Sequence, residues 1–242
     1  MNDDGILYQG GNVDCIHPLL KKVLPDICAV SVNRKISLLN LGSGISFAFE
    51  QELCRRTKNI AKLVCIDRLP PPPQGNILLP YMEYKQMNIE QELFLEHTFD
   101  FIIATEVIEH IDHTDILLKN AWRHLAPNGS FLLAAPNLAS FLSRMELLFG
   151  FQPHLLEVSN ETAVVGTGII GRMNNSGAVL HHIRGITYKA MKELLLYHHF
   201  KVKKVYGRSA SFLSLFDYVP SLSSDVLYVC KKSIMDKEKY NG

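Results

Sequence analysis

The chain has 242 residues, of which 47% are hydrophobic and 20% are charged, and this composition excludes a largely disordered protein and suits one domain with an elaborated cap. A formal net charge of +1 argues against dependence on a broad nucleic-acid-binding surface. Five scattered cysteines without a Cys-x-x-Cys pair argue against a disulfide framework or a zinc site and favour a reducing compartment.

Residues 1–32 are expected to lead into the main domain, residues 33–230. Residues 16–30 have apolar side chains at helical spacing, and Pro25 is expected to interrupt or kink this helix, which would cover a sheet face or a cleft. No signal-like apolar run follows the acidic start, and no apolar stretch reaches the roughly 18 residues of a spanning helix. We therefore expect a cytoplasmic protein.

A strand that ends in glycines comes next. The apolar residues 37–41 stop at Gly42-Ser43-Gly44, and a helical pattern resumes over residues 47–56. Such a turn brings bare backbone and the N–H groups of a helix start against a ligand. The following strand, residues 61–66, ends at Asp67, about 23 residues after Gly44, where a carboxylate can hold a ribose diol. Because a third glycine is missing, a nucleoside without a diphosphate is the expected ligand, and a plain turn with nothing bound is the alternative.

Strands and helices then alternate. Residues 70–73 are four prolines, which predict a stiff extended connection. Strands are expected over residues 84–89, 98–104 and 130–135, with a helix over residues 114–125 and a Pro-Asn-Gly turn at 127–129. This order predicts an α/β fold in which helices cover both faces of a parallel sheet and the strand ends form a cleft. The polar residues at the strand ends are Asn40, Asp67, Asn88, Thr105, Glu106 and Asn137.

Residues 138–180 break this alternation with an apolar helix over residues 141–149 and a glycine-rich stretch. We interpret them as an inserted helical cap with a mobile loop over the cleft, and a membrane-lying or dimer-forming face is the alternative. Thr187 is the expected N-cap of a helix over residues 188–199. Strands over residues 201–206 and 219–230 are expected to pair antiparallel at the sheet edge, before a loose charged tail, residues 231–242.

Four segments of this chain follow one another in a familiar order: residues 39–44 (LNLGSG), 99–111 (FDFIIATEVIEHI), 125–131 (LAPNGSF) and 182–187 (HIRGIT). Together they resemble the motifs of the class I S-adenosylmethionine-dependent methyltransferases. The resemblance covers residues 32–230. It implies a Rossmann-like, doubly wound, mostly parallel seven-stranded sheet, and S-adenosylmethionine as the cofactor.

The resemblance also implies which residues bind the cofactor. The expected positions are Asn40, Gly42, Ser43 and Gly44 along the methionine part, Asp67 and Arg68 at the ribose, Asn88 and Ile89 at the adenine, and Thr105 and Glu106 at the sulfonium. Two acids common in the family are amides here. Asn40 removes a charge from any water-mediated contact to the amine of the cofactor, whereas Asn88 can still pair with the adenine through its carbonyl.

Residues 106–110 carry the candidates for catalysis. Glu106, Glu109 and His110 have the spacing of one face of a helical turn and, with His181 or His182, resemble a Mg²⁺ or Mn²⁺ site of small-RNA 2′-O-methyltransferases and ubiquinone-pathway O-methyltransferases. Hydrogen bonds that hold the loop without a metal are the alternative interpretation. The candidate catalytic residues are His182, His110 and Glu106, and the candidate metal ligands are Glu106, Glu109, His110 and His182.

Arg184 and Asn137 are the candidates for binding the methyl acceptor, with a surface turn as the alternative for His182 and Arg184.

We expect O-methylation of a small-molecule or lipid-like acceptor, because the cap is apolar. One alternative is metal-dependent 2′-O-methylation of an RNA ribose, for which the chain offers few basic residues, so nucleic acid is not the expected partner. Another is a non-catalytic methyltransferase-like partner subunit, which Asn40 and the missing third glycine would explain. The short glycine loop argues against a nicotinamide enzyme.

Overall fold

The computed structural model describes residues 16–71, 79, 81–174 and 179–233. Its centre is one seven-stranded sheet. The strands are β1 (Ile36–Leu41), β2 (Ile60–Asp67), β3 (Met82–Gln86), β4 (Phe99–Thr105), β5 (Leu125–Pro136), β6 (Phe200–Arg208) and β7 (Asp225–Lys232). Their order is β3-β2-β1-β4-β5-β7-β6, and β7 runs antiparallel to both β5 and β6 while the other neighbours are parallel. The expected doubly wound, mostly parallel sheet is confirmed, and its strand order reverses between β1 and β4.

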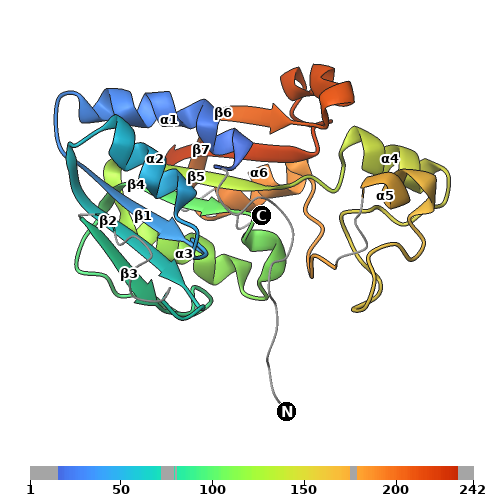
Figure 1. Ribbon diagram of the computed structural model, residues 1–242, viewed down its shortest axis with the longest axis horizontal. Helices are drawn as coiled ribbons and strands as arrows, with labels where there is room; N and C mark the ends of the chain where they lie inside the picture. The colour runs from blue at the N-terminus through green and yellow to red at the C-terminus, as the bar shows by residue number, and fades with distance from the viewer. Residues whose placement is uncertain (1–15, 72–78, 80, 175–178, 234–242) are drawn as a thin grey trace, which may run out of the picture.

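Helices cover both faces of this sheet (Figure 1). They are α1 (Pro18–Ser31), α2 (Ala48–Arg56), α3 (Thr114–His124), α4 (Phe141–Leu148), α5 (Gly168–Asn174) and α6 (Tyr188–Tyr197), with the 3₁₀ segments η1 (Ile108–His110) and η2 (Ser211–Tyr218). Successive strand residues alternate between two cores. Leu38 packs in the core that contains α1 and α2, and Leu39 in the core that contains α3 and α6. Because both faces are buried, the central strands are continuous apolar runs.

Helix α1 continues through Pro25, so the expected interruption is wrong. Pro25 lies on the exposed side of the helix, where solvent can reach the carbonyl whose hydrogen bond the proline removes. The opposite side buries five apolar residues against the sheet, each worth roughly 1.5–3 kcal/mol, which outweighs the roughly 3 kcal/mol cost of an internal proline. These residues are Leu19, Leu20, Val23, Leu24 and Ile27.

Several boundaries differ from the sequence-based expectation. Strand β3 ends at Gln86, so Asn88 and Ile89 lie in the loop that follows it. Strand β5 begins at Leu125 and includes the expected turn at 127–129, which appears as a register shift against β4. Strand β7 begins at Asp225, because residues 219–224 form turns and bends after the unexpected η2. Part of the proline run and most of the expected tail lie outside the described residues.

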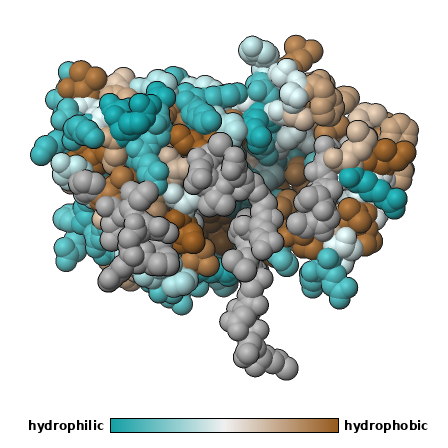
Figure 2. Space-filling view, viewed as in Figure 1, coloured by the Kyte–Doolittle hydropathy of each residue, from teal (hydrophilic) through white to brown (hydrophobic). Residues whose placement is uncertain are grey.

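The residues expected to form a cap contain two helices, α4 and α5, which lie together beyond one end of the sheet (Figure 1). Ser140 caps α4, since its side chain accepts a hydrogen bond from the N–H of Ser143. Glu146 is fully buried and pairs with Nδ1 of His154 at 2.9 Å, which ties the loop after α4 back onto that helix. Figure 2 shows hydrophobic residues gathered over this part of the surface. The exposed apolar side chains there include Leu147, Leu148, Phe149, Ile169 and Met173.

None of the helices in the described ranges is both long enough and apolar enough to span a bilayer.

Candidate active site

The glycine loop after β1 is held by the end of β2. The N–H groups of Gly42 and Ser43 both donate to the carbonyl of Ile66, at 2.8 and 3.2 Å. Gly42 has φ +74°, and a Cβ there would overlap the Val107 side chain, so conformation and space both require glycine. Gly44 also has a positive φ, +61°, but a Cβ there would meet nothing within 4 Å. The loop therefore packs on the protein at Gly42 and faces open space at Gly44.

Asp67 binds the same loop from the end of β2. One carboxylate oxygen accepts from the N–H of Gly44 at 2.8 Å and the other from the N–H of Leu69 at 3.0 Å. Arg68 beside it is exposed. In the loop after β3, the side-chain oxygen of Asn88 accepts from the N–H of Glu90 at 2.9 Å, so it is already engaged in a local turn.

A cavity of about 190 Å³ lies where β1 and β4 end, beneath the start of α1. Five residues expected at the cofactor line it, namely Asn40, Gly42, Ser43, Thr105 and Glu106. The sequence did not point to the remaining lining residues, among which are His17 on α1 and Glu50 on α2. Nε2 of His17 is 3.7 Å from a carboxylate oxygen of Glu106. Burial lowers the pKa of His17 to about 4, so its imidazole is neutral near pH 7.

The segment after β4 turns sharply at Glu106, which has φ +53°. The hydroxyl of Thr105 and one carboxylate oxygen of Glu106 are buried and have no hydrogen-bond partner among the described residues. The pKa of Glu106 is raised well above its usual range by burial and by the nearby charge of Glu109. The end of β4 therefore presents polar atoms that a bound molecule could satisfy.

Glu109 and His110 on η1 meet His182, which precedes α6, and their potential ligand atoms lie within 4.8 Å of one another. Nδ1 of His110 is 3.1 Å from the carbonyl oxygen of His181, and Nδ1 of His182 is 2.8 Å from that of Leu155. Because a carbonyl oxygen only accepts, both Nδ1 atoms donate, and each Nε2 carries the lone pair. We call Glu109, His110 and His182 the histidine cluster.

The backbone and burial of Glu109 shape this cluster. Its carbonyl accepts from the N–H groups of Ile183 and Arg184, at 2.9 and 3.1 Å, which fixes the segment of His182 against η1. The carboxylate is 2% exposed, and neither oxygen has a hydrogen-bond partner in the described part of the chain. Burial raises the pKa of Glu109 to about 7.

The sequence matches a family model described as a methyltransferase domain over residues 16–184. The chain belongs to this family and is a class I S-adenosylmethionine-dependent methyltransferase. A comparison with curated proteins finds no match.

Solved methyltransferase structures share the fold at low sequence identity. An S-adenosylmethionine-dependent methyltransferase from Clostridium acetobutylicum is 12% identical, with a TM-score of 0.56 over 91% of this chain and 93% of that one. The N-methyltransferase NodS from Bradyrhizobium japonicum is 15% identical, with a TM-score of 0.53 over 90% and 98%. The 1,6-didemethyltoxoflavin-N1-methyltransferase from Burkholderia thailandensis, solved with bound S-adenosylhomocysteine, is 15% identical, with a TM-score of 0.50 over 87% and 76%.

The structure of this methyltransferase groups three of the four proposed metal ligands, Glu109, His110 and His182. The expected helical turn is absent at this position, because η1 begins at Ile108 and Glu106 adopts a left-handed conformation. Glu106 lines the cavity beside His17 and also interacts with the carboxyl group of Glu109. The group that the structure brings together therefore has one carboxylate and two imidazoles, whereas the expected face had two carboxylates and one imidazole.

The side chains of the two candidates for acceptor binding make hydrogen bonds to the backbone of the methyltransferase. The guanidinium of Arg184 donates to the carbonyls of Ile111 and Asp112, at 3.0 and 2.5 Å. Asn137 is 1% exposed, its amide donates to two backbone carbonyls of the segment before β7, and its oxygen accepts from two backbone N–H groups. Both side chains therefore hold the framework of the site together, and their contact with the acceptor stays a prediction.

The histidine cluster fits a divalent metal ion by its chemistry. One carboxylate and two imidazole Nε2 atoms form a donor set that transition metals accept. The Glu109 carboxylate is buried with no hydrogen-bond partner among the described residues and with Nε2 of His110 3.8 Å away, and a cation would offset the cost of its burial. Each Nδ1 contacts a backbone carbonyl, and such a hydrogen bond fixes the orientation of a histidine ring that binds a metal through Nε2.

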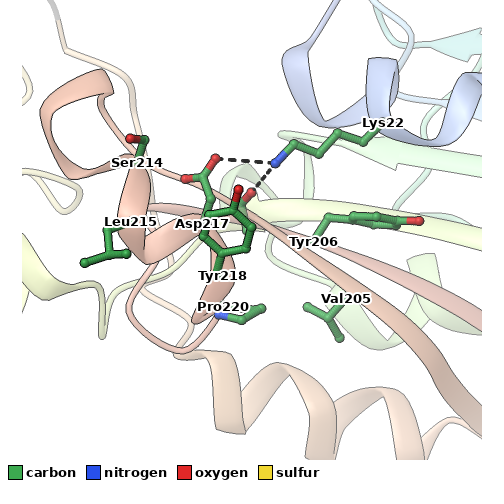
Figure 3. Close-up of a pocket in the computed structure, with 9 residues that line it drawn as sticks. Lys22, Val205, Tyr206, Ser214, Leu215, Asp217, Tyr218 and Pro220 are labelled. Carbon is green, nitrogen blue, oxygen red and sulfur yellow. Dashed lines mark hydrogen bonds and ion pairs between the residues drawn. The ribbon is translucent and has the colours of Figure 1, made fainter.

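A larger cavity of about 640 Å³ lies between α1, β6 and η2 (Figure 3). Lys22 reaches into it from α1, donates to the carbonyl of Gly207 at 2.7 Å, and lies 3.4 Å from a carboxylate oxygen of Asp217. Its charge is thus already paired. None of the residues expected at the cofactor or in the histidine cluster lines this cavity, so it is distinct from the candidate active site.

Proposed function

We propose that this methyltransferase methylates an oxygen of a small-molecule or lipid-like acceptor that binds between the histidine cluster and the cap. The observation that carries the proposal is the orientation of His182. Its ring donates through Nδ1 to the carbonyl of Leu155, so Nε2 is the nitrogen that can take a proton. A hydroxyl acceptor must lose its proton during transfer, and a neutral imidazole is suited to accept it.

The proposed cofactor site is the cavity under α1 together with the glycine loop. S-adenosylmethionine supplies a methyl group that is already activated by a positive sulfur. We assign Gly42, Ser43 and Gly44 to its methionine part and Asp67 to its ribose, since the loop faces open space beside that carboxylate. Thr105 and Glu106 would border the reacting end, where their unpartnered oxygens lie.

The proposed metal site consists of Glu109, His110 and His182, without Glu106. Imidazole ligands favour Mn²⁺ over Mg²⁺, because Mg²⁺ prefers an all-oxygen shell. Metal-dependent methylation of an RNA ribose remains the second candidate. The donor set supports it, but Nε and one Nη of Arg184 already donate to backbone carbonyls, which leaves fewer of its N–H groups for a phosphate.

The test is a methyl-transfer assay with paired acceptors. Formation of S-adenosylhomocysteine is measured with apolar phenols, the corresponding anilines, and an RNA oligonucleotide with a free 2′-hydroxyl at its 3′ end. Each is run with Mn²⁺ and with a chelator. We expect turnover with a phenol and none with its aniline. Turnover with anilines alone, or with RNA alone, would overturn the proposal.

A further inference from the structure

Glu50 is a buried acid in the cavity under α1. It lies in the first turn of α2, is 2% exposed, and lines the cavity together with Asn40. One of its carboxylate oxygens accepts from the amide of Asn40 at 2.6 Å and from the thiol of Cys65 at 3.7 Å. Both donors are neutral, so they orient the carboxylate without balancing a negative charge.

The surroundings of Glu50 supply no positive charge. Among the described residues that line the cavity there is neither lysine nor arginine, and its one imidazole, on His17, is neutral near pH 7. Burial raises the pKa of Glu50, which reflects the cost of holding an unbalanced charge there. A cation that enters the cavity would remove this cost.

We infer that Glu50, oriented by Asn40, binds the ammonium group of the methionine part of the cofactor. This inference rests on the proposed placement of that part in the cavity. The ammonium is a compact cation with three N–H donors, and it matches the buried carboxylate that lines this cavity. In this enzyme the negative charge that binds the ammonium comes from Glu50 on α2. The end of β1 contributes only the neutral amide of Asn40, which orients the carboxylate of Glu50.

The inference predicts that a change at Glu50 affects the affinities of two ligands differently, although both contain the same adenosine part. S-adenosylhomocysteine carries the amino-acid group, and 5′-methylthioadenosine lacks it, while both have an uncharged thioether. We expect Glu50→Gln to weaken S-adenosylhomocysteine binding roughly 10- to 100-fold, as for the loss of a hydrogen bond to a charged group, and to leave 5′-methylthioadenosine binding unchanged. Calorimetric titration measures both affinities.

A charge-exchange variant is the matched control. In Asn40→Asp/Glu50→Gln the pair keeps its hydrogen bond, because the new glutamine can donate to the new aspartate, and the negative charge moves to the end of β1. We expect this variant to recover most of the lost S-adenosylhomocysteine affinity. Recovery shows that a charge, rather than a particular side chain on α2, is what the ligand requires.

Two outcomes would overturn the inference. If Glu50→Gln weakens both ligands equally, Glu50 acts only on the structure of the cavity. If it weakens neither, the ammonium binds elsewhere. The proposed cofactor placement fails in a different way, which Asp67→Ala detects: that change should weaken both ligands, because both carry the ribose diol.

Discussion

The two halves of the candidate active site differ in how their polar groups are satisfied. In the glycine-loop half, the N–H of Gly42 bonds to the end of β2, and both oxygens of Asp67 accept backbone hydrogen bonds. In the histidine half, the carboxylate of Glu109 is buried without a hydrogen-bond partner among the described residues. The backbone of the glycine loop is therefore held in place by the protein, whereas the histidine half contains a buried group that a bound molecule can satisfy.

This difference indicates where each half obtains its specificity. A preformed loop binds its ligand at little conformational cost, which suits a cofactor common to all turnovers. Buried and unsatisfied atoms reject molecules that cannot bond to them, which suits the choice of an acceptor. The predictions below test this division, beginning with the largest expected effect.

The strongest test is His182→Gln, in the histidine half. Loss of a proton acceptor is expected to lower the rate of methyl transfer roughly 100- to 10,000-fold, while S-adenosylhomocysteine affinity in a calorimetric titration stays within about twofold. The matched control is His181→Asn, because His181 is exposed, contributes its carbonyl to His110, and has a positive φ that asparagine tolerates. An equal loss of rate in both variants would contradict the role of His182.

The next test compares two glycines of the loop. Gly42→Ala is expected to destabilise the fold by about 2–4 kcal/mol, because its Cβ meets Val107 and its φ is left-handed. Gly44→Ala adds a Cβ in open space and is expected to cost only about 1 kcal/mol. Urea unfolding measures both, and Val107→Ala should partly restore the stability of Gly42→Ala. Equal destabilisation by both changes would show that Val107 does not restrict the loop.

Asp67 offers a smaller effect in the same half. Asp67→Ala is expected to reduce S-adenosylmethionine affinity roughly 10- to 100-fold, because it removes the proposed ribose contact and the anchor of Gly44. Asp67→Asn keeps one accepting oxygen, so its S-adenosylmethionine affinity should lie between that of the wild type and that of Asp67→Ala. Unchanged affinity in the alanine variant would remove Asp67 from the proposed site.

The smallest effect comes from a histidine whose two nitrogens are both engaged. Nε2 of His124 accepts from the N–H of Leu95 at 3.0 Å, and Nδ1 is 2.9 Å from the carbonyl of Asn120. Burial lowers the pKa of His124. The folded state therefore resists protonation of His124. The contribution of neutral His124 to stability is present above its unfolded pKa of about 6.5 and is lost as the pH falls below that value.

The measurement is urea unfolding of His124→Gln between pH 7 and pH 5. Glutamine can accept the same N–H bond without titrating, so this variant should lose less stability than the wild type as the pH falls. Its pH profile of methyl transfer should match that of the wild type. A parallel stability loss in both proteins would assign the pH dependence to other groups.

Local patterns in the sequence predicted the framework and part of the site. Thr187 was recognisable because it caps a helix three residues on. The glycine turn and Asp67, 23 residues apart, were recognisable because they end two successive strands of one βαβ unit. The roles of Asn137 and Arg184 were not recognisable, because their partners lie far along the chain, such as the carbonyl of Ser221, 84 residues from Asn137.

The same reason explains the residues that were missed. His17 and Glu50 reach the cavity only because α1 and α2 pack over the end of the sheet, and nothing in their own segments marks them as polar contacts. The left-handed turn at Glu106 was also missed, since glutamate rarely adopts it and a helical spacing predicts otherwise. Tertiary packing decides these positions.

The acid at the end of β4 has a consequence for turnover. Burial raises the pKa of Glu106, and a positively charged sulfonium beside it would lower that pKa again and attract the resulting carboxylate. Methyl transfer turns the sulfonium into a neutral thioether, so this attraction is present before the reaction and absent after it. If the sulfur lies beside this carboxyl group, as proposed, the donor is held more tightly than the spent product. Glu106 would then limit product inhibition and speed the exchange of S-adenosylhomocysteine for a fresh molecule of donor.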